Sequence, residues 1–420
     1  MLRGAPLRLD TFASVAALPP ETETLFDAAP DLFASRAWWR TVLAHGMPAG
    51  TEACFLLCRA GTAPAALFPL RQPASGGTLD SLTTPYTCLY APLLRPELDD
   101  AARTRVFTAF GRFCRGWATT RLDALPADWP DLALCMAGAR TAGLAVLRFD
   151  HFGNWYEPVG GMDWGGYLAS RSGALRETVR RKLRRGERGP GADFSVITGP
   201  EGLDAGIDAF EHVYAKSWKE PEPFPRFNAG LMREVASAGV LRLGLYRIGD
   251  QTVAAQLWIV DRGKATVLKL AHDEAFKPES PGTVLTALML RRLLDEEHVA
   301  EIDFGRGDDP YKQGWAGQRR QRIGLILANP RRPAGLALLT RHAAGRVHAW
   351  ITRRPGHGGA LRHAVPSRHD GIPRDGGTPR HPNEGQHPRL CRTHEGQSWV
   401  PAVVGMTSLA WPSPPASGEI

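Results

Sequence analysis

Three consecutive strand-forming segments, followed by a helix and one more strand, constrain the fold of this 420-residue chain most strongly. The apolar segments 240–248, 252–260 and 265–273 are separated by two short turns, each containing one glycine. Turns of this length join antiparallel neighbours in a sheet. We therefore predict an antiparallel meander, then a helix over 283–298 and a strand over 300–304 that returns to the sheet.

The remainder of the chain alternates helices and strands in a similar order. A hairpin is predicted over 52–60 and 63–71, and a last strand over 321–329. Both halves of the chain run through helices, antiparallel strands, a helix and a strand, so a divergent duplication is a reasonable hypothesis. We predict an α/β (α+β) protein with mixed, mostly antiparallel sheets, divided into an N-terminal domain over 1–160 and a C-terminal domain over 161–335.

The C-terminal residues 345–420 differ in composition from the rest. They hold seven of the 13 histidines, together with many prolines and glycines. Such a segment buries too little apolar surface to offset its ordering entropy, so we predict a disordered tail, and its irregular histidine spacing argues against a metal site. The net charge of +8 is concentrated in this tail and in 174–188, which contains seven basic and two acidic residues.

Several classes of protein are excluded or disfavoured by what the sequence lacks. No apolar run approaches the ~20 residues of a transmembrane helix, and the N-terminus is a poor signal peptide, so we expect a cytoplasmic protein. The motifs G-x-S-x-G, G-x-x-x-x-G-K-[ST] and H-E-x-x-H are absent. Cys54 and Cys58 lie in an apolar strand and are interpreted as core residues rather than metal or redox ligands.

Several stretches of the chain, taken together and in order, resemble one family. They are LRETVRRKLRR, YAKSWK, VAAQLWI, KLAHDEAFKPESPGTVL and IDFGRGDDPYKQGW, preceded by WWRTVL and APAALFPL near the N-terminus. The chain resembles bacterial GNAT acetyltransferases of the cellulose- or polysaccharide-biosynthesis type, which are relatives of Fem-type peptidoglycan bridge-forming transferases. The resemblance implies tandem GNAT-like acyltransferase domains, an active site in the second domain, and acetyl-CoA or another acyl-CoA as co-substrate.

The donor site is predicted where the meander meets the following helix. The first N–H groups of a helix have no partner inside it and suit a pyrophosphate. By resemblance to GNAT folds, the acyl-CoA would contact residues of the third meander strand and of the helix start, namely Leu270, His272, Ser280, Gly282 and Thr283. This chain has Ser-Pro-Gly where GNAT folds usually carry Arg/Gln-x-x-G-x-Gly/Ala. Ser280 as an ordinary helix cap explains the residues equally well.

The catalytic candidates lie at two strand ends. Asp303 ends a short strand before a glycine-bounded loop, where a carboxylate can orient or deprotonate an amine or hydroxyl. By resemblance to an aromatic-Lys-x-x-aromatic motif of Fem-type transferases, Lys312 would stabilise negative charge at the acyl carbonyl or hold an anionic acceptor, with Tyr311 and Trp315 lining the pocket. Asp273 is a candidate for positioning the acceptor. The alternatives are a solvated lysine and a plain strand-end turn.

Two further features point to substrate contacts. Trp218 is interpreted as a core or cleft-wall residue on the acceptor side. Arg181 and Arg185 belong to a basic helical stripe that can hold phosphates of CoA, tRNA or a nucleotide sugar. The alternative is a solvated helix face with Val179 and Leu183 packed inward. No aromatic interleaving or helix-turn-helix accompanies the basic stripe, so specific nucleic-acid readout is not expected.

The function predicted from these features is metal-independent acyl transfer. We expect an acetyl or other acyl group to pass from acyl-CoA to an amine or hydroxyl of a small-molecule or glycan-precursor acceptor, such as a sugar or a cell-envelope or polysaccharide precursor. We also expect Lys312→Ala and Asp303→Ala to lower turnover while leaving the fold intact. Two alternatives stay open: a Fem-like transferase that uses aminoacyl-tRNA, and a non-catalytic scaffold in polysaccharide assembly.

Overall fold

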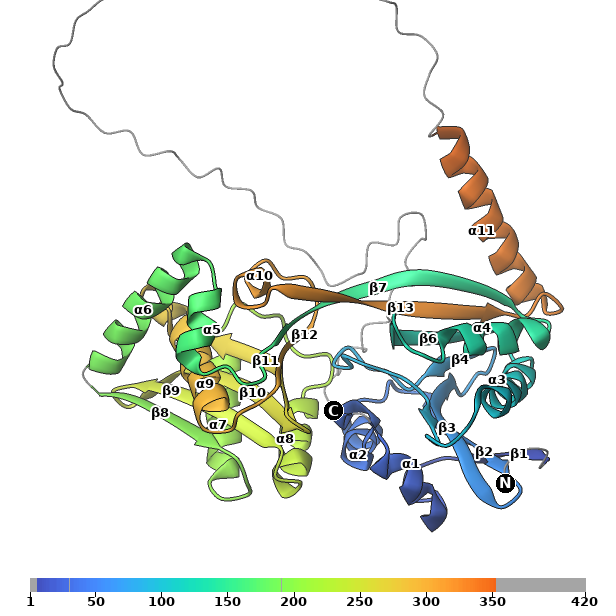
Figure 1. Ribbon diagram of the computed structural model, residues 1–420, viewed down its shortest axis with the longest axis horizontal. Coiled ribbons are helices and arrows are strands. Elements are labelled where there is room, and N and C mark those ends of the chain that lie inside the picture. Colours follow the sequence, from blue (N-terminus) through green and yellow to red (C-terminus); the bar gives the residue numbers. More distant parts are fainter. Residues whose placement is uncertain (1–5, 30, 190, 353–420) are drawn as a thin grey trace, which may run out of the picture. The chain divides into compact units, whose positions relative to one another are not determined.

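The computed structural model describes residues 6–29, 31–189 and 191–352, and residues up to Thr340 form one compact unit (Figure 1). The disorder predicted for 353–420 lies outside the described residues. For 345–352 the prediction of disorder is wrong, because these residues complete helix α11 (Pro333–Thr352). The composition of 345–420 predicts disorder from Gly345 onward, yet one glycine within a helix costs only about 1 kcal/mol.

The first half of the chain contributes seven strands and four helices to the described structure. The strands are β1 (Leu7–Phe12), β2 (Thr51–Ala60), β3 (Ala63–Pro73), β4 (Thr78–Ser81), β5 (Leu93–Leu94), β6 (Thr119–Pro126) and β7 (Ala145–Pro158). The helices are α1 (Glu23–Asp27), α2 (Arg36–His45), α3 (Asp100–Cys114) and α4 (Leu132–Thr141), with short 3-10 turns at Pro20–Thr22 and Leu32–Ala34. The predicted hairpin is confirmed, since β2 and β3 pair antiparallel. Cys54 and Cys58 are buried in β2, as predicted.

The second half contains the predicted meander. Its strands are β8 (Ala192–Ile197), β9 (Leu241–Ile248), β10 (Gln251–Asp261), β11 (Lys264–His272), β12 (Glu301–Arg306) and β13 (Gln318–Ala328). Its helices are α5 (Trp164–Ser170), α6 (Gly173–Arg188), α7 (Leu203–Ala215), α8 (Phe227–Ser237), α9 (Pro281–Asp295) and α10 (Lys312–Trp315), and a 3-10 segment, η3, covers Glu274–Glu279. Strands β9, β10 and β11 pair antiparallel in sequence order, which confirms the meander.

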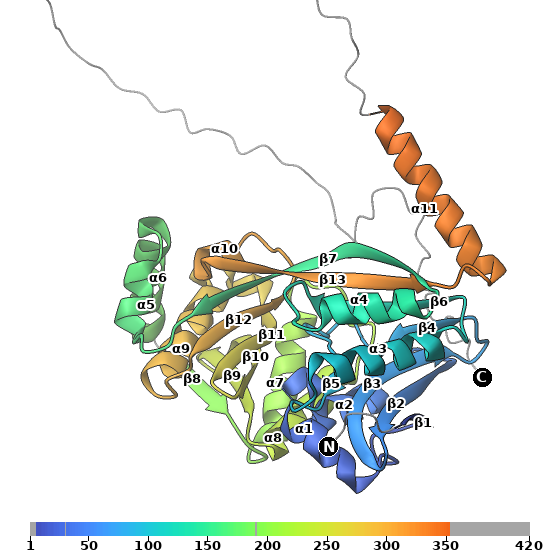
Figure 2. The same ribbon diagram turned by 45° about the vertical axis from the view of Figure 1, so that its right-hand side comes forward.

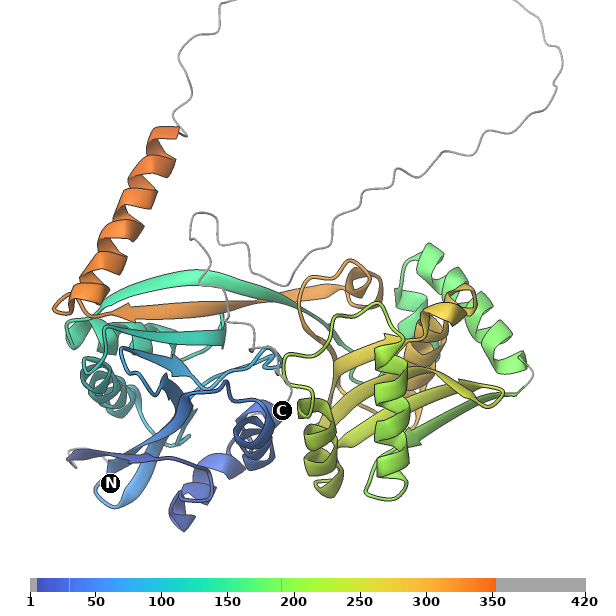
Figure 3. The ribbon, with the colours of Figure 1, turned by 180° about the vertical axis from the view of Figure 1, so that it is seen from behind.

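One mixed sheet runs through both halves, and the halves exchange a strand within it. The order is β1-β2-β3-β4-β6-β13-β7-β12-β11-β10-β9-β8, with β4/β6 and β11/β12 parallel. The last strand, β13, lies between β6 and β7 of the first half, and β7 pairs with β12 of the second half. Figures 1 and 3 show β7 and β13 running side by side from one half to the other. The last strand predicted over 321–329 therefore forms, but both of its partners belong to the first half.

In the second half, one hydrophobic core lies on each face of the sheet. On one face, α5, α6 and α9 pack on residues such as Trp258 and Val267. On the other face, α7 and α8 pack on residues such as Leu243 and Leu257, in a core that is continuous with the first half. Figure 2 shows α3 and α4 lying together over the sheet of the first half. Successive side chains along a strand point to opposite faces of the sheet, so one strand contributes residues to both cores.

Candidate active site

Strands β11 and β12 separate soon after they meet. They pair in parallel only over 264–266 and 301–303. Gly305 has φ of +66°, and a Cβ atom there would lie 2.6 Å from the carbonyl oxygen of Val267, so this close approach requires glycine. Beyond Thr266, no strand in the described part of the chain pairs with the β12-facing side of β11. We call residues 267–272 of β11 the open edge, since their main-chain groups can bond to an extended ligand.

Helix α9 begins beside the end of the open edge. A Cβ atom at Gly282 would lie 3.2 Å from Nδ1 of His272, so the imidazole lies against the first turn of the helix. Ser280 precedes the helix in a left-handed conformation (φ +57°), and its hydroxyl makes no capping hydrogen bond. Ser280 is therefore the N-cap residue and Pro281 opens the helix, as the alternative states, but the contact is made by the carbonyl oxygen of Ser280, which accepts the Val284 N–H at 3.1 Å. The structure brings His272 together with the segment Ser280, Gly282 and Thr283, and Leu270 lies two residues before His272 on β11.

His272 is packed between an aromatic ring and an acidic side chain. The ring centroids of His272 and Trp218 are 4.5 Å apart, and Nε2 of His272 lies 3.2 Å from the Glu274 carboxylate. Burial lowers the pKa of His272, although Glu274 acts in the opposite direction, so the ring is neutral at pH 7. Trp218 is 51% exposed, which makes it a surface wall of the site rather than a core residue.

Asp273 has a structural task at the end of β11. Its Oδ1 accepts a hydrogen bond of 2.9 Å from the Ala275 N–H and so caps η3. Its Oδ2 lies 3.5 Å from Nζ of Lys216, and its own N–H donates to the Val253 carbonyl. These contacts favour the alternative that Asp273 forms a plain strand-end turn. Its role in positioning the acceptor stays a prediction.

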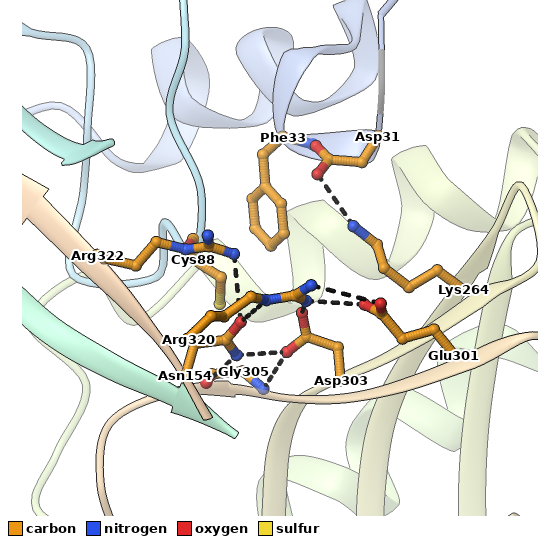
Figure 4. A network of polar contacts seen from close by, with 10 residues as sticks. All are labelled: Asp31, Phe33, Cys88, Asn154, Lys264, Glu301, Asp303, Gly305, Arg320 and Arg322. Carbon is orange, nitrogen blue, oxygen red and sulfur yellow. Dashed lines mark hydrogen bonds and ion pairs between the residues drawn. The ribbon is translucent and has the colours of Figure 1, made fainter. Parts of the chain in front are cut away.

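Asp303 is enclosed in a polar network between the two halves (Figure 4). Its Oδ1 accepts hydrogen bonds from Asn154 Nδ2 (2.6 Å) and from the Gly305 N–H (2.7 Å), and its Oδ2 accepts one from Arg320 (2.5 Å). Arg320 also pairs with Glu301 at 2.8 Å. A nearby ion pair, Lys264 with Asp31 at 3.1 Å, joins the halves again.

The charge of Asp303 is compensated inside the protein. Burial alone would raise its pKa, but Arg320 and Lys264, with hydrogen bonds from Asn154 and Gly305, hold the pKa below its usual value. Asp303 is only 3% exposed, and both oxygens are occupied. These contacts give Asp303 a structural role. They do not favour the role of a base, which stays a prediction.

Lys312 holds the loop that follows β12. Its Nζ donates to the carbonyl oxygens of Arg306 (2.6 Å) and Gly307 (3.3 Å) and pairs with Asp309 at 3.0 Å. Lys312 is 3% exposed, so the alternative of a solvated lysine is wrong. Tyr311 is 43% exposed, whereas Trp315 is buried, and its carbonyl accepts a hydrogen bond from the Tyr167 hydroxyl. Of the two aromatic residues of the motif, only Tyr311 is exposed to solvent.

The basic helix α6 docks against the segment that leads into α9. Val179 and Leu183 are buried, as predicted, and Lys182 Nζ donates to the Pro278 carbonyl at 3.1 Å. Arg181 and Arg185 are exposed, and Arg185 lies 4.0 Å from Glu279. Within the described ranges, no acidic side chain pairs with Arg181, and phosphate binding by this residue stays a prediction.

A second cluster was missed from the sequence. We call Tyr86, Tyr214, Glu222 and Lys269 the lysine–glutamate cluster. Lys269 Nζ and the Tyr214 hydroxyl both donate to the Glu222 carboxylate, and Lys269 Nζ lies 4.7 Å from the Tyr86 ring centroid. Burial would raise the pKa of Glu222, but Lys269 and the hydrogen bonds lower it. Tyr214 begins the quoted stretch YAKSWK, but no local pattern links Tyr86 to residues more than a hundred positions away.

Three further findings concern the described residues, and none of them points to a different functional site. No group of three His, Cys, Asp or Glu side chains in the described part is placed to hold a metal ion. None of the helices there is both long and apolar enough to cross a membrane. A cavity of 580 Å³ lies between α2 and α8, but it is lined by none of the predicted site residues.

Comparison with known proteins supports the acyltransferase prediction. Residues 173–313 match the family model of the acetyltransferase (GNAT) domain, so the second half carries a GNAT-type acyltransferase domain. This region contains the meander, the open edge and the start of α9. No curated protein sequence matches the chain. The polysaccharide-biosynthesis type stays a prediction.

Several solved structures are similar to the chain. The crystal structure of FemX is 11% identical over 76% of this chain and 98% of its own, with a TM-score of 0.52. A tandem GNAT protein from the clavulanic acid biosynthesis pathway is 14% identical over 77% and 99%, with a TM-score of 0.42. L-PGS from Bacillus licheniformis is 13% identical over 75% and 95%, with a TM-score of 0.44. The similarity to FemX concerns the fold, which in this chain is a mixed α/β arrangement around one mixed sheet.

Proposed function

We propose that this protein transfers an acetyl or other acyl group from acyl-CoA to an amine or hydroxyl of a sugar or another cell-envelope or polysaccharide precursor. One observation carries the proposal. The open edge of β11 ends at the start of α9, and both lie inside the region that matches the GNAT domain. An unpaired strand edge beside a helix N-terminus suits a ligand that is extended at one end and anionic at the other.

In this proposal, each part of the acyl-CoA donor has a place along the open edge and the start of α9. In our proposal the pyrophosphate lies at the first turn of α9, where Gly282 lets the chain approach closely and Ser280 and Thr283 flank it. Arg181 and Arg185 of α6, which docks on the preceding segment, would hold further phosphate charge. The extended arm of the donor would pair with the open edge past His272 and Leu270, with the acyl group toward the point where β11 and β12 separate.

The transfer itself needs positioning more than reactive side chains. The acceptor nitrogen or oxygen forms a bond to the acyl carbon, the thioester C–S bond breaks, and the proton of the acceptor passes to the sulfur. In our proposal a main-chain N–H near Leu270–His272 stabilises the developing oxyanion. Because Lys312 and Asp303 are enclosed, we assign them positioning roles: Lys312 shapes the loop, and Asp303 secures β12. Trp218 and Tyr311, both exposed, would contact the acceptor.

Thermal unfolding of the full-length protein tests donor binding. Acetyl-CoA, longer acyl-CoAs and free CoA should each raise the unfolding midpoint by a few degrees when present at about 100 times the dissociation constant. Gly282→Val places a branched side chain against the His272 ring and should abolish the shift. Gly199→Val is the matched control, since a Cβ atom there would meet nothing within 4 Å. Release of CoA on addition of acceptor amines then measures turnover.

The alternatives give different results in the same experiment. Absence of a shift with every CoA species, combined with stabilisation by aminoacyl-tRNA, would contradict an acyl-CoA donor and favour the Fem-like transferase. Absence of both shifts, combined with stable association with other polysaccharide-assembly proteins, would favour a scaffold. An equal loss of the shift in Gly282→Val and Gly199→Val would refute the assignment of the donor site.

A further inference from the structure

The proposed function places an acyl-CoA along the open edge, and the inference that follows rests on that proposal. The direction of the open edge then gives the position of the acyl group. From His272 back to Val267, β11 extends by roughly 17 Å at 3.3–3.4 Å per residue. If the phosphates lie at the start of α9, the acyl end reaches the part of β11 near Lys269, just past the β-bulge between Leu257 and Trp258 of β10. The side chains around Lys269 therefore decide which acceptor can approach.

The lysine–glutamate cluster surrounds this point with charges that neutralise one another. Glu222 accepts from Lys269 and Tyr214, and the Tyr86 ring faces the Lys269 ammonium. The acid–base pair is complete, and its carboxylate is held in the charged form. The pair therefore presents a rigid, nearly neutral wall, rather than an unsatisfied charge, to an incoming acceptor.

Lys219 follows Trp218 in the chain and makes no ion pair with an acidic side chain among the described residues. Its Nζ lies over the Trp218 ring at 5.3 Å from the centroid, and no carboxylate in the described part of the chain is within ion-pairing distance. Burial lowers the pKa of Lys219, and the charge of Lys269 lowers it further; Lys312 adds to this effect, while Asp309 and Glu222 oppose it. Glu222 is paired with Lys269 and Asp309 with Lys312, so neither carboxylate is left to balance the charge of Lys219.

We propose that Lys219, backed by the Trp218 ring and by the Glu222–Lys269 pair, binds an anionic group of the acceptor, a carboxylate or a phosphate. An anion there would supply the hydrogen-bonded counter-charge that a partly buried ammonium lacks. The exposed faces of Trp218 and Tyr311 would contact the ring of a sugar, since aromatic side chains at such sites combine an apolar face with a wet environment. The acceptor class is thus an acidic amino or hydroxy sugar rather than a neutral one.

The test compares acceptors that differ only in charge. Glucosamine, glucosamine 6-phosphate and glucosaminuronic acid are each titrated into the full-length protein without donor, and each is assayed for CoA release with acetyl-CoA. We expect at least one anionic sugar to bind roughly 10-fold or more tightly than glucosamine. Comparison of glucosamine 6-phosphate with glucosaminuronic acid shows whether the site prefers a phosphate or a carboxylate. Titration without donor makes the result independent of the proposed function.

The variants identify the side chain responsible. Lys219→Met should raise the KM of the anionic acceptor roughly 10-fold while leaving the KM of glucosamine and the acetyl-CoA shift unchanged, and Lys219→Arg should restore most of the loss. Equal binding of neutral and anionic sugars by the wild-type protein, which needs no variant to fold, would overturn the inference. So would an unchanged KM in Lys219→Met. Normal CoA shifts alongside either result would leave the acyl-CoA proposal intact.

Discussion

At the scale of single residues, burial separates reactive groups from structural ones. Asp303 is a catalytic candidate in the sequence because it ends a short strand before a glycine-bounded loop. Lys312 is one because it lies in a motif that resembles that of Fem-type transferases. In the folded protein every polar atom of their charged groups is already engaged, by Asn154, Gly305 and Arg320 for the aspartate and by carbonyl oxygens for the lysine. A buried charge has to be compensated in this way, since its desolvation is otherwise too costly.

Substituting Asp303 tests its structural role. Asp303→Ala leaves Arg320 and Asn154 without their partner in a buried site, so we expect a loss of about 3–5 kcal/mol in the free energy of unfolding. This revises the earlier expectation that the fold stays intact. Asp308→Ala is the control, because Asp308 pairs with Arg319 on the surface with 46% of its side chain exposed, and should cost less than about 1 kcal/mol. Urea unfolding measures both; similar values would refute the structural role.

His151 predicts a pH dependence of stability. The Ala124 N–H donates to its Nδ1 at 3.0 Å, and Nε2 lies 3.3 Å from the Arg306 guanidinium. Burial lowers the pKa of His151 from 6.5 to about 4. The unfolded chain therefore binds a proton at higher pH than the folded one, and stability is lost as pH falls from about 6.5 to about 4, by about 3 kcal/mol in all.

The substitution His151→Asn isolates this contribution. The side-chain oxygen of the introduced asparagine can accept the Ala124 hydrogen bond but does not titrate in this range. Unfolding measured between pH 4 and 7 should therefore show a shallower slope in His151→Asn than in the wild-type protein. Identical slopes would assign the acid sensitivity to other groups.

At the scale of elements, glycines decide how closely helices and strands approach the site. Gly305 permits β12 to approach the Val267 carbonyl of β11 closely, and Gly186 permits α6 to pack on α9. A Cβ atom at Gly186 would lie 2.9 Å from a methyl group of Val284 and 3.0 Å from the Tyr246 hydroxyl, whose hydrogen bond to the Gly186 carbonyl holds α6 in place. Sequence patterns predicted both elements but not the contacts between them, because a glycine's neighbours in space are not its neighbours in sequence.

Substituting glycines within α6 tests this packing. Gly186→Val forces α6 away from α9 and should destabilise the protein by about 1–3 kcal/mol. Gly173→Val is the control at the start of the same helix, where the nearest atom to a Cβ is an Arg176 nitrogen at 3.8 Å. Thermal unfolding of both variants, with acetyl-CoA present and absent, should show a lower midpoint and a weaker ligand shift for Gly186→Val alone. A normal shift in that variant would argue against a role of α6 in donor binding.

At the scale of the whole molecule, the exchange of strands joins the two halves. Each parallel pair, β4/β6 and β11/β12, is flanked by a strand that the other half supplies. Removing either half therefore exposes strand edges that are paired in the intact sheet. The predicted domains 1–160 and 161–335 stay a prediction, and the exchange gives a reason to expect that they depend on each other.

Separate expression of residues 161–335 tests this dependence. This fragment lacks β7, so β12 and β13 lose a partner, and we expect it to be unfolded or aggregated. The full-length chain should unfold in a single cooperative transition of its sheet. Circular dichroism during heating measures both. Cooperative unfolding of the fragment near the wild-type midpoint would instead show that the second domain is autonomous.

The sequence by itself determined many of the helices and strands, whereas the donor site at the start of α9 stays a prediction that rests on the family resemblance. The meander, the hairpin and the helix after Ser280 follow from local periodicity and turn residues, which act over about ten positions. Tertiary structure alone decided the rest: the place of β13, the enclosure of Asp303 and Lys312, and the meeting of Tyr86 with Glu222. These depend on which distant surfaces bury each other and on which charges are then compensated, and such pairings leave no local pattern in the chain.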